Sequence, residues 1–113
     1  EVISMERHPA LSKQAAAVLA ELGHKNVTLV VGDGTLGWPG RAPYDRIIVT
    51  AGAAQCPSAP FDQLAEGGIL AIPVGGQDCQ TLQAIRKQEG QPHRSNLSPC
   101  RFVPLVGAQG WPE

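Results

Sequence analysis

The sequence predicts an α/β protein built on a mostly parallel sheet, and two observations lead to this fold class. Short apolar runs rich in β-branched residues recur along the first two thirds of the chain, separated by stretches with helical spacing. The resulting order, strand–helix–strand followed by strand–helix–strand, is typical of a parallel sheet. The final segments are then expected to form an antiparallel appendage, which such sheets often carry.

The first part of the chain predicts a strand, a helix and a second strand. Val2–Met5 is short and apolar, as expected of a buried strand. Pro9 suits the first turn of a helix, and Gly23 is placed to end it. Val27–Val31 follows as a strand rich in β-branched residues. Helical spacing predicts one apolar helix face, made of Leu11, Ala15, Val18, Leu19 and Leu22.

The middle of the chain predicts a second strand–helix–strand order. Asp33–Pro43 is heavy in glycine and proline and is expected to be a loop. A strand is predicted over Arg46–Thr50, with Tyr44-Asp45 as its entry turn. A short helix over Pro57–Ala65 and a strand over Ile69–Val74 complete the order.

The last third is less regular. Gln80–Lys87 lacks a clean period of two, so its pattern fits a strand or a helix. The polar stretch Gln88–Pro99 is expected to be an exposed loop. Phe102–Leu105 is predicted to be the last strand.

Length and composition limit the functions to consider. The 113 residues predict one domain, and 42% hydrophobic against 17% charged residues is typical of a globular protein. A formal net charge of −1 gives no electrostatic basis for binding nucleic acid or an anionic membrane. No apolar run approaches the roughly 20 residues of a membrane span. Because the chain opens on a strand-like run without an initial Met, we expect it to be a piece of a longer protein.

Three cysteines, Cys56, Cys79 and Cys100, lie more than 20 residues apart, and no C-x-x-C pair exists. This odd, scattered set indicates reduced thiols and a cytoplasmic protein. A zinc site that combines them with histidines would need the close ligand pairs that are missing here. We therefore expect no metal.

A glycine motif, Gly32-x-Gly34-x-x-Gly37, has the spacing of a dinucleotide-binding fingerprint. Such a fingerprint needs a helix that opens inside it, since the helix N-terminus holds the pyrophosphate. The segment after it, Trp38-Pro39-Gly40, breaks any helix there. A turn-rich connection that needs glycines for positive φ is the simpler interpretation.

A third interpretation depends on two acids at predicted strand ends, Glu6 and Asp33. Ligands of α/β proteins bind beyond the carboxyl ends of parallel strands. One carboxylate can accept from two ribose hydroxyls and another from an exocyclic amine, which fits the adenosine of S-adenosylmethionine (AdoMet). Each acid alone is more often a helix cap or a solvated turn residue.

The sequence resembles the protein-L-isoaspartate O-methyltransferase family. Four stretches carry the resemblance, in order along almost the whole chain. They are VISMER (Val2–Arg7), NVTLVVGDGTLGWPGRAPYDRIIVTAGA (Asn26–Ala53), QLAEGGILAIPVG (Gln63–Gly75) and RFVPLVGAQGW (Arg101–Trp111). The resemblance implies a Rossmann-like, AdoMet-dependent methyltransferase fold. It also implies transfer of a methyl group from AdoMet to the carboxyl of L-isoaspartyl residues in damaged proteins, the first step of their repair.

The resemblance also implies roles for individual residues. Glu6 would accept from the ribose hydroxyls, Asp33 and Gly34 would border the adenine, and Thr50 would lie on the cofactor side. The substrate side would be lined by Ala51, Gly52, Ala53, Val103, Pro104 and Leu105. Trp38 is expected to cover apolar surface rather than to contact a ligand. No residue is singled out as catalytic.

Two elements of the family pattern are absent from the 113 residues. One is the first strand with its glycine-rich loop of the type E-x-G-x-G-x-G, and the other is a segment with a serine in a Ser-Gln-Pro-type motif. The missing strand would lie between Val2–Met5 and Arg46–Thr50, so both strands would keep an open edge. The two strands could close up within one chain, pair with a second copy or pair with a separate N-terminal segment. We favour a homodimer over a closed monomer, and we expect this chain alone to be inactive. The alternative function is a non-catalytic remnant that acts as an oligomeric or partner-binding module.

Overall fold

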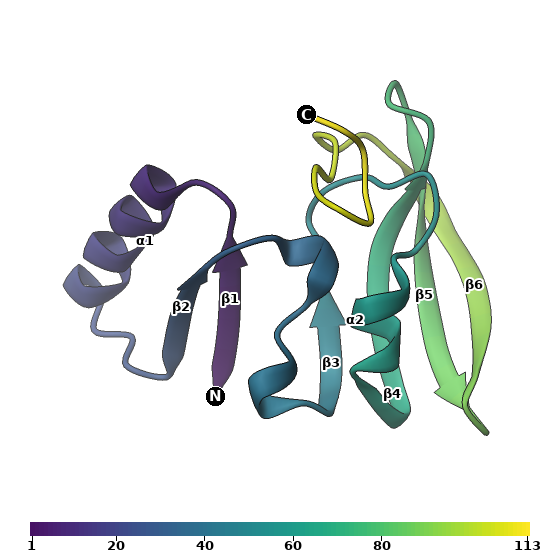
Figure 1. Ribbon diagram of the computed structural model, residues 1–113, viewed down its shortest axis with the longest axis horizontal. Helices are drawn as coiled ribbons and strands as arrows, with labels where there is room; N and C mark the ends of the chain where they lie inside the picture. The colour runs from purple at the N-terminus through teal and green to yellow at the C-terminus, as the bar shows by residue number, and fades with distance from the viewer. The chain divides into compact units, whose positions relative to one another are not determined.

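The computed structural model describes residues 1–113, which form two compact units, Glu1–Gly34 and Thr35–Glu113. The first unit contains β1 (Val2–Glu6), α1 (Pro9–Glu21) and β2 (Val27–Val31) (Figure 1). The two strands pair in parallel, with Val2 opposite Val27 and Glu6 opposite Val31. The predicted strand–helix–strand order of this unit is confirmed.

Helix α1 begins and ends where the sequence predicts. Pro9 occupies its first turn, where a missing N–H costs no hydrogen bond. Gly23 follows the helix with a φ of 79°, a left-handed conformation that glycine adopts at helix ends. The predicted apolar face is wrong in one respect, because Leu11, Val18 and Leu22 are exposed and only Ser12 is buried. A sheet of two strands is too narrow to cover a helix face.

The second unit contains a four-stranded sheet with the order β3-β4-β5-β6. Strand β3 pairs with β4 in parallel, and the other two pairs are antiparallel. The α/β class is therefore confirmed, with parallel pairs followed by an antiparallel C-terminal sheet. The elements are β3 (Tyr44–Ile48), α2 (Ser58–Asp62), β4 (Leu64–Gly75), β5 (Gln80–Gln88) and β6 (Gln91–Cys100).

The hydrophobic core belongs to the second unit and centres on β4. Leu70 and Ile72 alternate along this strand, so both point to one face of the sheet and are fully buried. Ile85 joins them from β5, and Phe61 of α2 packs against the same cluster. The core thus fixes the strands whose ends carry the predicted substrate side.

Strand β3 begins and ends two residues earlier than predicted. It covers Tyr44–Ile48 rather than Arg46–Thr50, so Tyr44-Asp45 belongs to the strand and Thr50 lies beyond it. The reason is that the Tyr44 N–H donates to the Gln63 carbonyl at 2.8 Å, which starts the pairing early. Helix α2 is shorter than predicted, and β4 begins five residues earlier, at Leu64.

The predicted loop over Gln88–Pro99 is wrong, because it forms most of β6. A two-residue turn at Glu89 and Gly90, with φ of 53° and 74°, joins β6 to β5. Positive φ at both central residues is the geometry that matches the twist of a hairpin. Strand β6 tolerates its two prolines because it is the outer strand of the sheet.

Glu66 stabilises this turn. Its carboxylate accepts from the N–H groups of Glu89 and Gly90. These two hydrogen bonds lower the pKa of Glu66. At a pH above the ordinary carboxyl pKa, Glu66 is charged and stabilises the turn. This contribution to the stability of the folded state is lost as the pH falls through the lowered pKa.

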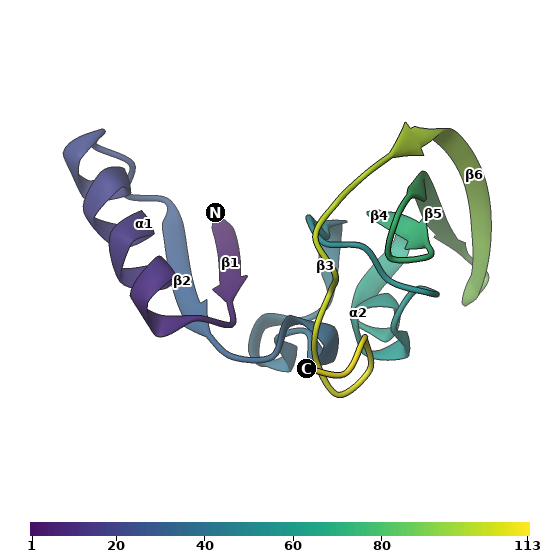
Figure 2. The same ribbon diagram turned by 90° about the horizontal axis from the view of Figure 1, so that it is seen from above.

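Phe102–Leu105 is not the predicted last strand. It returns from β6 toward the end of β3, as the view from above shows, and makes one parallel bridge, between Pro104 and Gly52 (Figure 2). Proline has no N–H to donate, which limits the ladder at this position. The two α-helices, with 13 and 5 residues, both fall short of a membrane span.

Lys87 gives a first testable prediction. Its ammonium donates to the carbonyls of Phe61, Asp62 and Leu64 at 3.0–3.3 Å and lies 5.1 Å from the centre of the Phe61 ring. It therefore satisfies carbonyls where α2 ends. Lys87→Met keeps the aliphatic stem and removes the donors, so we expect it to lower the free energy of unfolding by about 1–3 kcal/mol.

Urea denaturation at neutral pH measures this change. Arg86→Met is the matched control, because Arg86 is the exposed neighbour on the same strand. Equal midpoints for the two variants would show that the three carbonyl contacts add nothing to stability.

Candidate functional site

The two predicted acids lie at the carboxyl ends of paired strands in the first unit. Glu6 is the last residue of β1, and Asp33 follows β2 after Gly32. The Gly32 N–H donates to the Glu6 carbonyl at 3.0 Å, which continues the ladder to the very end of both strands. The structure therefore brings Glu6 and Asp33 to one edge of the sheet, as predicted.

The carboxylate of Glu6 is oriented by the backbone that follows it. Its Oε2 accepts from the N–H groups of Arg7 at 2.6 Å and His8 at 3.1 Å. These two N–H groups belong to the connection between β1 and α1, and the N-cap residue of α1, His8, makes no side-chain capping bond, so Glu6 orders the connection rather than capping the helix. A carboxylate has about four acceptor positions, so these two bonds fix its direction and leave capacity for ribose hydroxyls.

The glycine motif does not open a helix. Instead, two short 3₁₀ turns follow, over Gly34–Leu36 and Pro39–Arg41. Gly37 has a φ of 64°, and a Cβ at this position would collide with the Gln63 side chain. Gly37 is thus a turn glycine, and the motif does not form a dinucleotide fingerprint.

Gly34 differs from Gly37, because no positive φ requires a glycine and a Cβ would meet nothing within 4 Å. The side of Gly34 on which a Cβ would lie is therefore open, directly after Asp33 in the chain. Trp38 is exposed and is held through its backbone, with its N–H donating to Gln63 Oε1 at 2.8 Å and its carbonyl accepting from the Tyr44 hydroxyl.

The predicted substrate side is assembled around Gly52 in the second unit. The Gly52 N–H donates to the Val103 carbonyl at 2.7 Å, and the Gly52 carbonyl accepts from the Leu105 N–H at 2.8 Å. The indole Nε1 of Trp111 donates to the same carbonyl at 3.1 Å. Ala53 continues the junction, since its N–H donates to the Pro73 carbonyl at 3.0 Å.

These bonds bring together Gly52, Ala53, Val103, Pro104 and Leu105, which lie about 50 residues apart in the sequence. Leu105 is half-buried against the core, whereas Val103 and Pro104 are exposed. Thr50 is exposed beyond β3, and Ala51 is half-buried. The structure therefore places the predicted substrate residues on two segments that touch.

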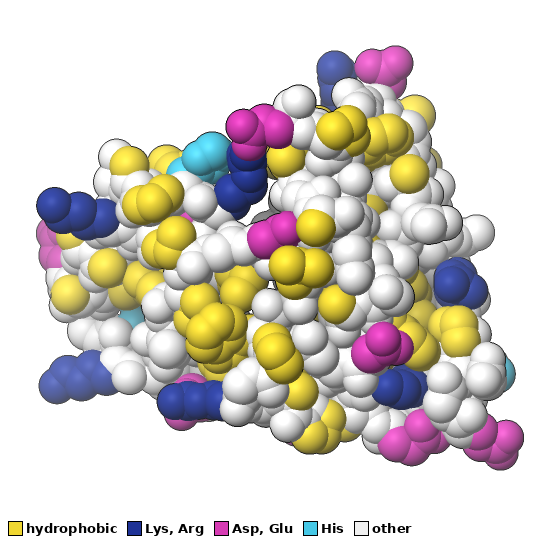
Figure 3. All heavy atoms as spheres, viewed as in Figure 1, with side chains coloured by type: hydrophobic (Ala, Val, Ile, Leu, Met, Phe, Trp, Pro, Cys, Tyr) yellow, Lys and Arg dark blue, Asp and Glu magenta, His cyan; other side chains and the backbone are white.

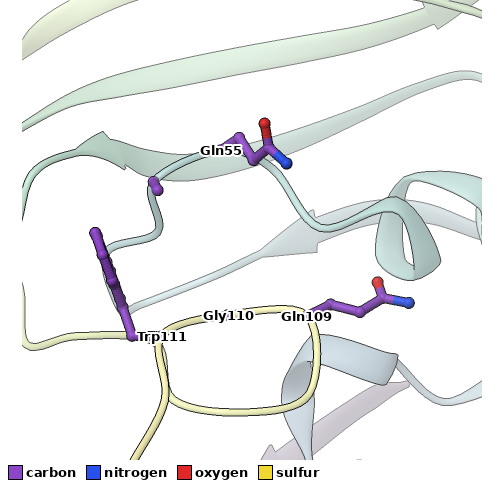
Figure 4. A pocket seen from close by; sticks show the side chains of 5 residues that line it. Gln55, Gln109, Gly110 and Trp111 are labelled. Carbon is purple, nitrogen blue, oxygen red and sulfur yellow. The ribbon is translucent and has the colours of Figure 1, made fainter.

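A pocket of about 230 Å³ borders this junction and is lined by Ala54, Gln55, Gln109, Gly110 and Trp111 (Figure 4). In the figure the Trp111 ring stands beside the segment that carries Gln55, and the Gln109 side chain extends toward α2. Ligand pockets usually measure about 300–1,000 Å³, so this one fits a side chain rather than a whole cofactor.

No local sequence pattern indicates the pocket residues, although Gln109 and Trp111 lie in Arg101–Trp111, one of the stretches that resemble the family. The side chain of Gln109 accepts from the Ala59 N–H at 3.0 Å and the Ser58 hydroxyl at 3.3 Å, which holds it against α2. Its backbone N–H donates to Thr35 Oγ1 at 3.0 Å. Gly110 is required, because a Cβ would collide with the Leu105 carbonyl. These residues can be recognised only from their contacts with distant parts of the chain, which no local sequence pattern predicts.

Other reactive groups do not form a second site. Burial raises the pKa of the Cys56 thiol to about 11, so it stays protonated at neutral pH and is a poor nucleophile. All three cysteines are free, and no three His, Cys, Asp or Glu residues are grouped to hold a metal ion. Basic and acidic side chains are interspersed on the face drawn in Figure 3.

Comparisons with known proteins agree on one family. The family model described as protein-L-isoaspartate(D-aspartate) O-methyltransferase matches residues 1–110. The protein-L-isoaspartate O-methyltransferase of Dictyoglomus turgidum is 49% identical over 111 residues, which are 98% of this chain and 50% of the relative. Protein-L-isoaspartate O-methyltransferase 1 of Syntrophobacter fumaroxidans is 50% identical over 97% of this chain and 51% of its own.

Two solved structures belong to the same family. A protein-L-isoaspartate O-methyltransferase superposes with a TM-score of 0.85 at 30% identity, over 96% of this chain and 35% of its own. A putative member from Plasmodium falciparum, solved in complex with S-adenosyl-L-homocysteine, gives 0.79 at 26% identity over 92% and 51%. The chain spans about half the length of the curated relatives it matches. With a family model matching nearly every residue, the chain belongs to the protein-L-isoaspartate(D-aspartate) O-methyltransferase family.

Proposed function

We propose that these residues supply the adenosine-binding acids and the acceptor side of a protein-L-isoaspartate O-methyltransferase. The observation that carries the proposal is the junction at Gly52, where the segment that follows β3 is bonded to Val103 and Leu105. Beyond the carboxyl end of a parallel strand is where α/β proteins bind their ligands. The acceptor would be the carboxylate of an L-isoaspartyl residue in a protein or peptide.

The residues of the first unit fit the adenosine part of AdoMet. Glu6 and Asp33 lie at one sheet edge, and Gly34 leaves space beside Asp33. In this proposal Glu6 accepts from the ribose hydroxyls and Asp33 and Gly34 border the adenine. The Plasmodium falciparum relative was solved with S-adenosyl-L-homocysteine, which supports the same cofactor here. When bound, AdoMet supplies an electrophilic methyl group.

The acceptor side needs no strong acid or base, because the nucleophile is already a carboxylate. The acceptor side aligns the carboxylate with the methyl group, so it contributes by orienting the reactants and not by transferring a proton. Backbone bonds at Gly52 provide that rigidity, and Thr50 and Val103 expose their side chains next to it. The pocket beside Trp111 would take a side chain next to the isoaspartyl residue.

Two peptides test the proposed function. An isoaspartyl peptide should shift the backbone NMR signals of Gly52 and Leu105, whereas the same peptide with normal aspartate should not. Equal shifts from both peptides, or none, would contradict the proposed acceptor side. The three free cysteines agree with a cytoplasmic location, which we also propose.

Cofactor binding is expected to be weak. We predict a dissociation constant for S-adenosyl-L-homocysteine in the millimolar range, near −4 kcal/mol, because only the adenosine part of the site is present. Asp33→Asn should weaken binding further, while Asp78→Asn, on an exposed turn of the second unit, should leave it unchanged. NMR titration measures all three proteins. Low-micromolar affinity would mean that another segment replaces the glycine-rich loop.

A second candidate function is a non-catalytic module that binds a second copy or a partner. The observation that favours it is the pair of outer strands β1 and β3, each paired on one side only. Val2 and Ile48 expose apolar side chains on them. This module would bind through its strands whether or not the cofactor acids are used.

A further inference from the structure

Gln80, the first residue of β5, buries an amide whose donor and acceptor are both used. Its Nε2 donates to the Gly76 carbonyl at 2.7 Å, and its Oε1 accepts from the Phe102 N–H at 2.8 Å. The residue is 4% exposed. The side chain thus links the turn between β4 and β5 to the segment that follows β6.

The same side chain touches the proposed acceptor side. A Cβ built on Gly52 would lie 2.8 Å from Gln80 Cδ and 3.0 Å from its Nε2. Gly52 is therefore a glycine because the Gln80 amide lies against it. One face of Gly52 contacts this amide, while its N–H and carbonyl bond to Val103 and Leu105.

We infer that Gln80 is a positioning residue for the acceptor side, which it holds by fixing Phe102 and supporting Gly52. Phe102 directly precedes Val103, so a bond at Phe102 sets where the Val103 carbonyl meets Gly52. The side chain must offer one donor and one acceptor at fixed places. Glutamine does so without a charge, whereas an ionised glutamate of nearly the same size offers no donor.

This inference rests on the proposed function only where it concerns the acceptor peptide, since the contacts of Gln80 are measurable without one. The deciding variant is Gln80→Glu, which keeps the acceptor for Phe102 but places a carboxylate oxygen against the Gly76 carbonyl. Two acceptors facing each other in a buried site repel. The amide position should therefore be lost while the size of the side chain is kept.

Amide hydrogen exchange in the native state is the readout. In Gln80→Glu the amides of Gly52, Phe102 and Leu105 should exchange about tenfold faster or more, as expected for the loss of a buried hydrogen bond. The amides that pair β5 with β6 should keep their rates. The matched control is Gln83→Glu, on the same strand, whose side-chain amide donates to Asn96 of β6 instead.

A merely structural role gives a different result. It would lower the thermal midpoint of Gln80→Glu and leave the exchange of Gly52 and Leu105 no faster than that of the β5–β6 amides. That outcome would overturn the inference. So would a Trp111 indole N–H resonance unchanged from the wild type, because this group donates to Gly52. Trp38→Phe assigns the resonance, since the chain has two tryptophans.

A second variant changes Gly52 instead of Gln80, which tests the same contact if Gln80→Glu does not fold. Gly52→Ala should push the Gln80 amide away and speed the exchange of Phe102. Gly76→Ala is its control, because a Cβ there meets nothing within 4 Å and the carbonyl is kept. Equal Phe102 exchange in the two alanine variants would overturn the inference.

The isoaspartyl peptide then separates the two proposals. If Gln80 positions the acceptor side, the peptide should shift the Gly52 signal less in Gln80→Glu than in the wild type. A wild type that ignores the peptide, with faster exchange in Gln80→Glu, would contradict the proposed function and leave the role of Gln80 standing. A peptide effect of equal size in both proteins would contradict the positioning role.

Discussion

Mixed with an isoaspartyl peptide and methyl-labelled AdoMet, these 113 residues are expected to transfer no methyl group above background. The reason is geometric. Methyl transfer depends on holding donor and acceptor in line. Holding two reactants in the right orientation can lower the activation free energy by roughly 7–11 kcal/mol. The residues that would hold the methionine part of AdoMet are not among those present, so most of this gain is lost.

A full-length relative in the same assay is the positive control for the peptide and the label. The chain should stay inactive at concentrations of S-adenosylmethionine that saturate its weak site. Peptide-dependent methylation that depends on Asp33 would contradict the prediction, and it would show that the glycine-rich loop and the serine segment are dispensable.

The second large effect concerns assembly. We expect the chain to form a homodimer at micromolar concentration, with a mass twice the 11.9 kDa of one copy. Strand β3 is an outer strand, and its Ile48 is 77% exposed. The unpaired N–H and C=O groups of an exposed edge strand can form a ladder with a second chain, so pairing with a second copy is favoured.

The four-stranded sheet has two outer strands, β3 and β6, and the sequence of β6 shows why β3 is the one to test. Strand β6 carries Pro92 and Pro99, and prolines blunt an edge because they cannot donate to a new ladder. Light scattering on Ile48→Lys should report a monomer, because an edge lysine opposes pairing. Leu97→Lys, on β6, should remain dimeric. A wild-type monomer with a cooperative thermal transition would contradict the dimer.

Local patterns were enough to predict the strands and the helix of the first unit, although not which helix residues are buried. Val2–Met5 and Val27–Val31 are apolar and β-branched, Pro9 and Gly23 mark the helix, and each signal lies within the segment it describes. The placement of Glu6 and Asp33 at one sheet edge followed directly, because adjacent parallel strands share their carboxyl ends.

The C-terminal hairpin could not be predicted in the same way. Strand β6 is polar and contains prolines, so its pattern is that of a loop, and it becomes a strand only because β5 offers a partner. Glu89 takes a positive φ that few side chains adopt, which the Glu66 carboxylate supports from another strand. Neither cause lies in the segment itself.

Some residues of the candidate site could be predicted from the sequence and others could not. The resemblance to a family singled out Gly52 and Leu105, but no local pattern indicated Gln80 or Gln109. Both are glutamines whose role is to bond backbone groups more than 20 residues away. Only tertiary structure reveals which glutamine is buried and which is solvated.

The junction at Gly52 also has a consequence for the order of folding. Its partners lie far along the chain, since Trp111 comes 59 positions after Gly52, whereas the hairpin of β5 and β6 joins neighbours. Contacts between distant residues form slowly, because a long loop must close before any bond stabilises it. The sheet should therefore form before the acceptor side does. On warming, the segment from Phe102 to Trp111 should detach first, so the protein would lose its acceptor side while its sheet is still intact.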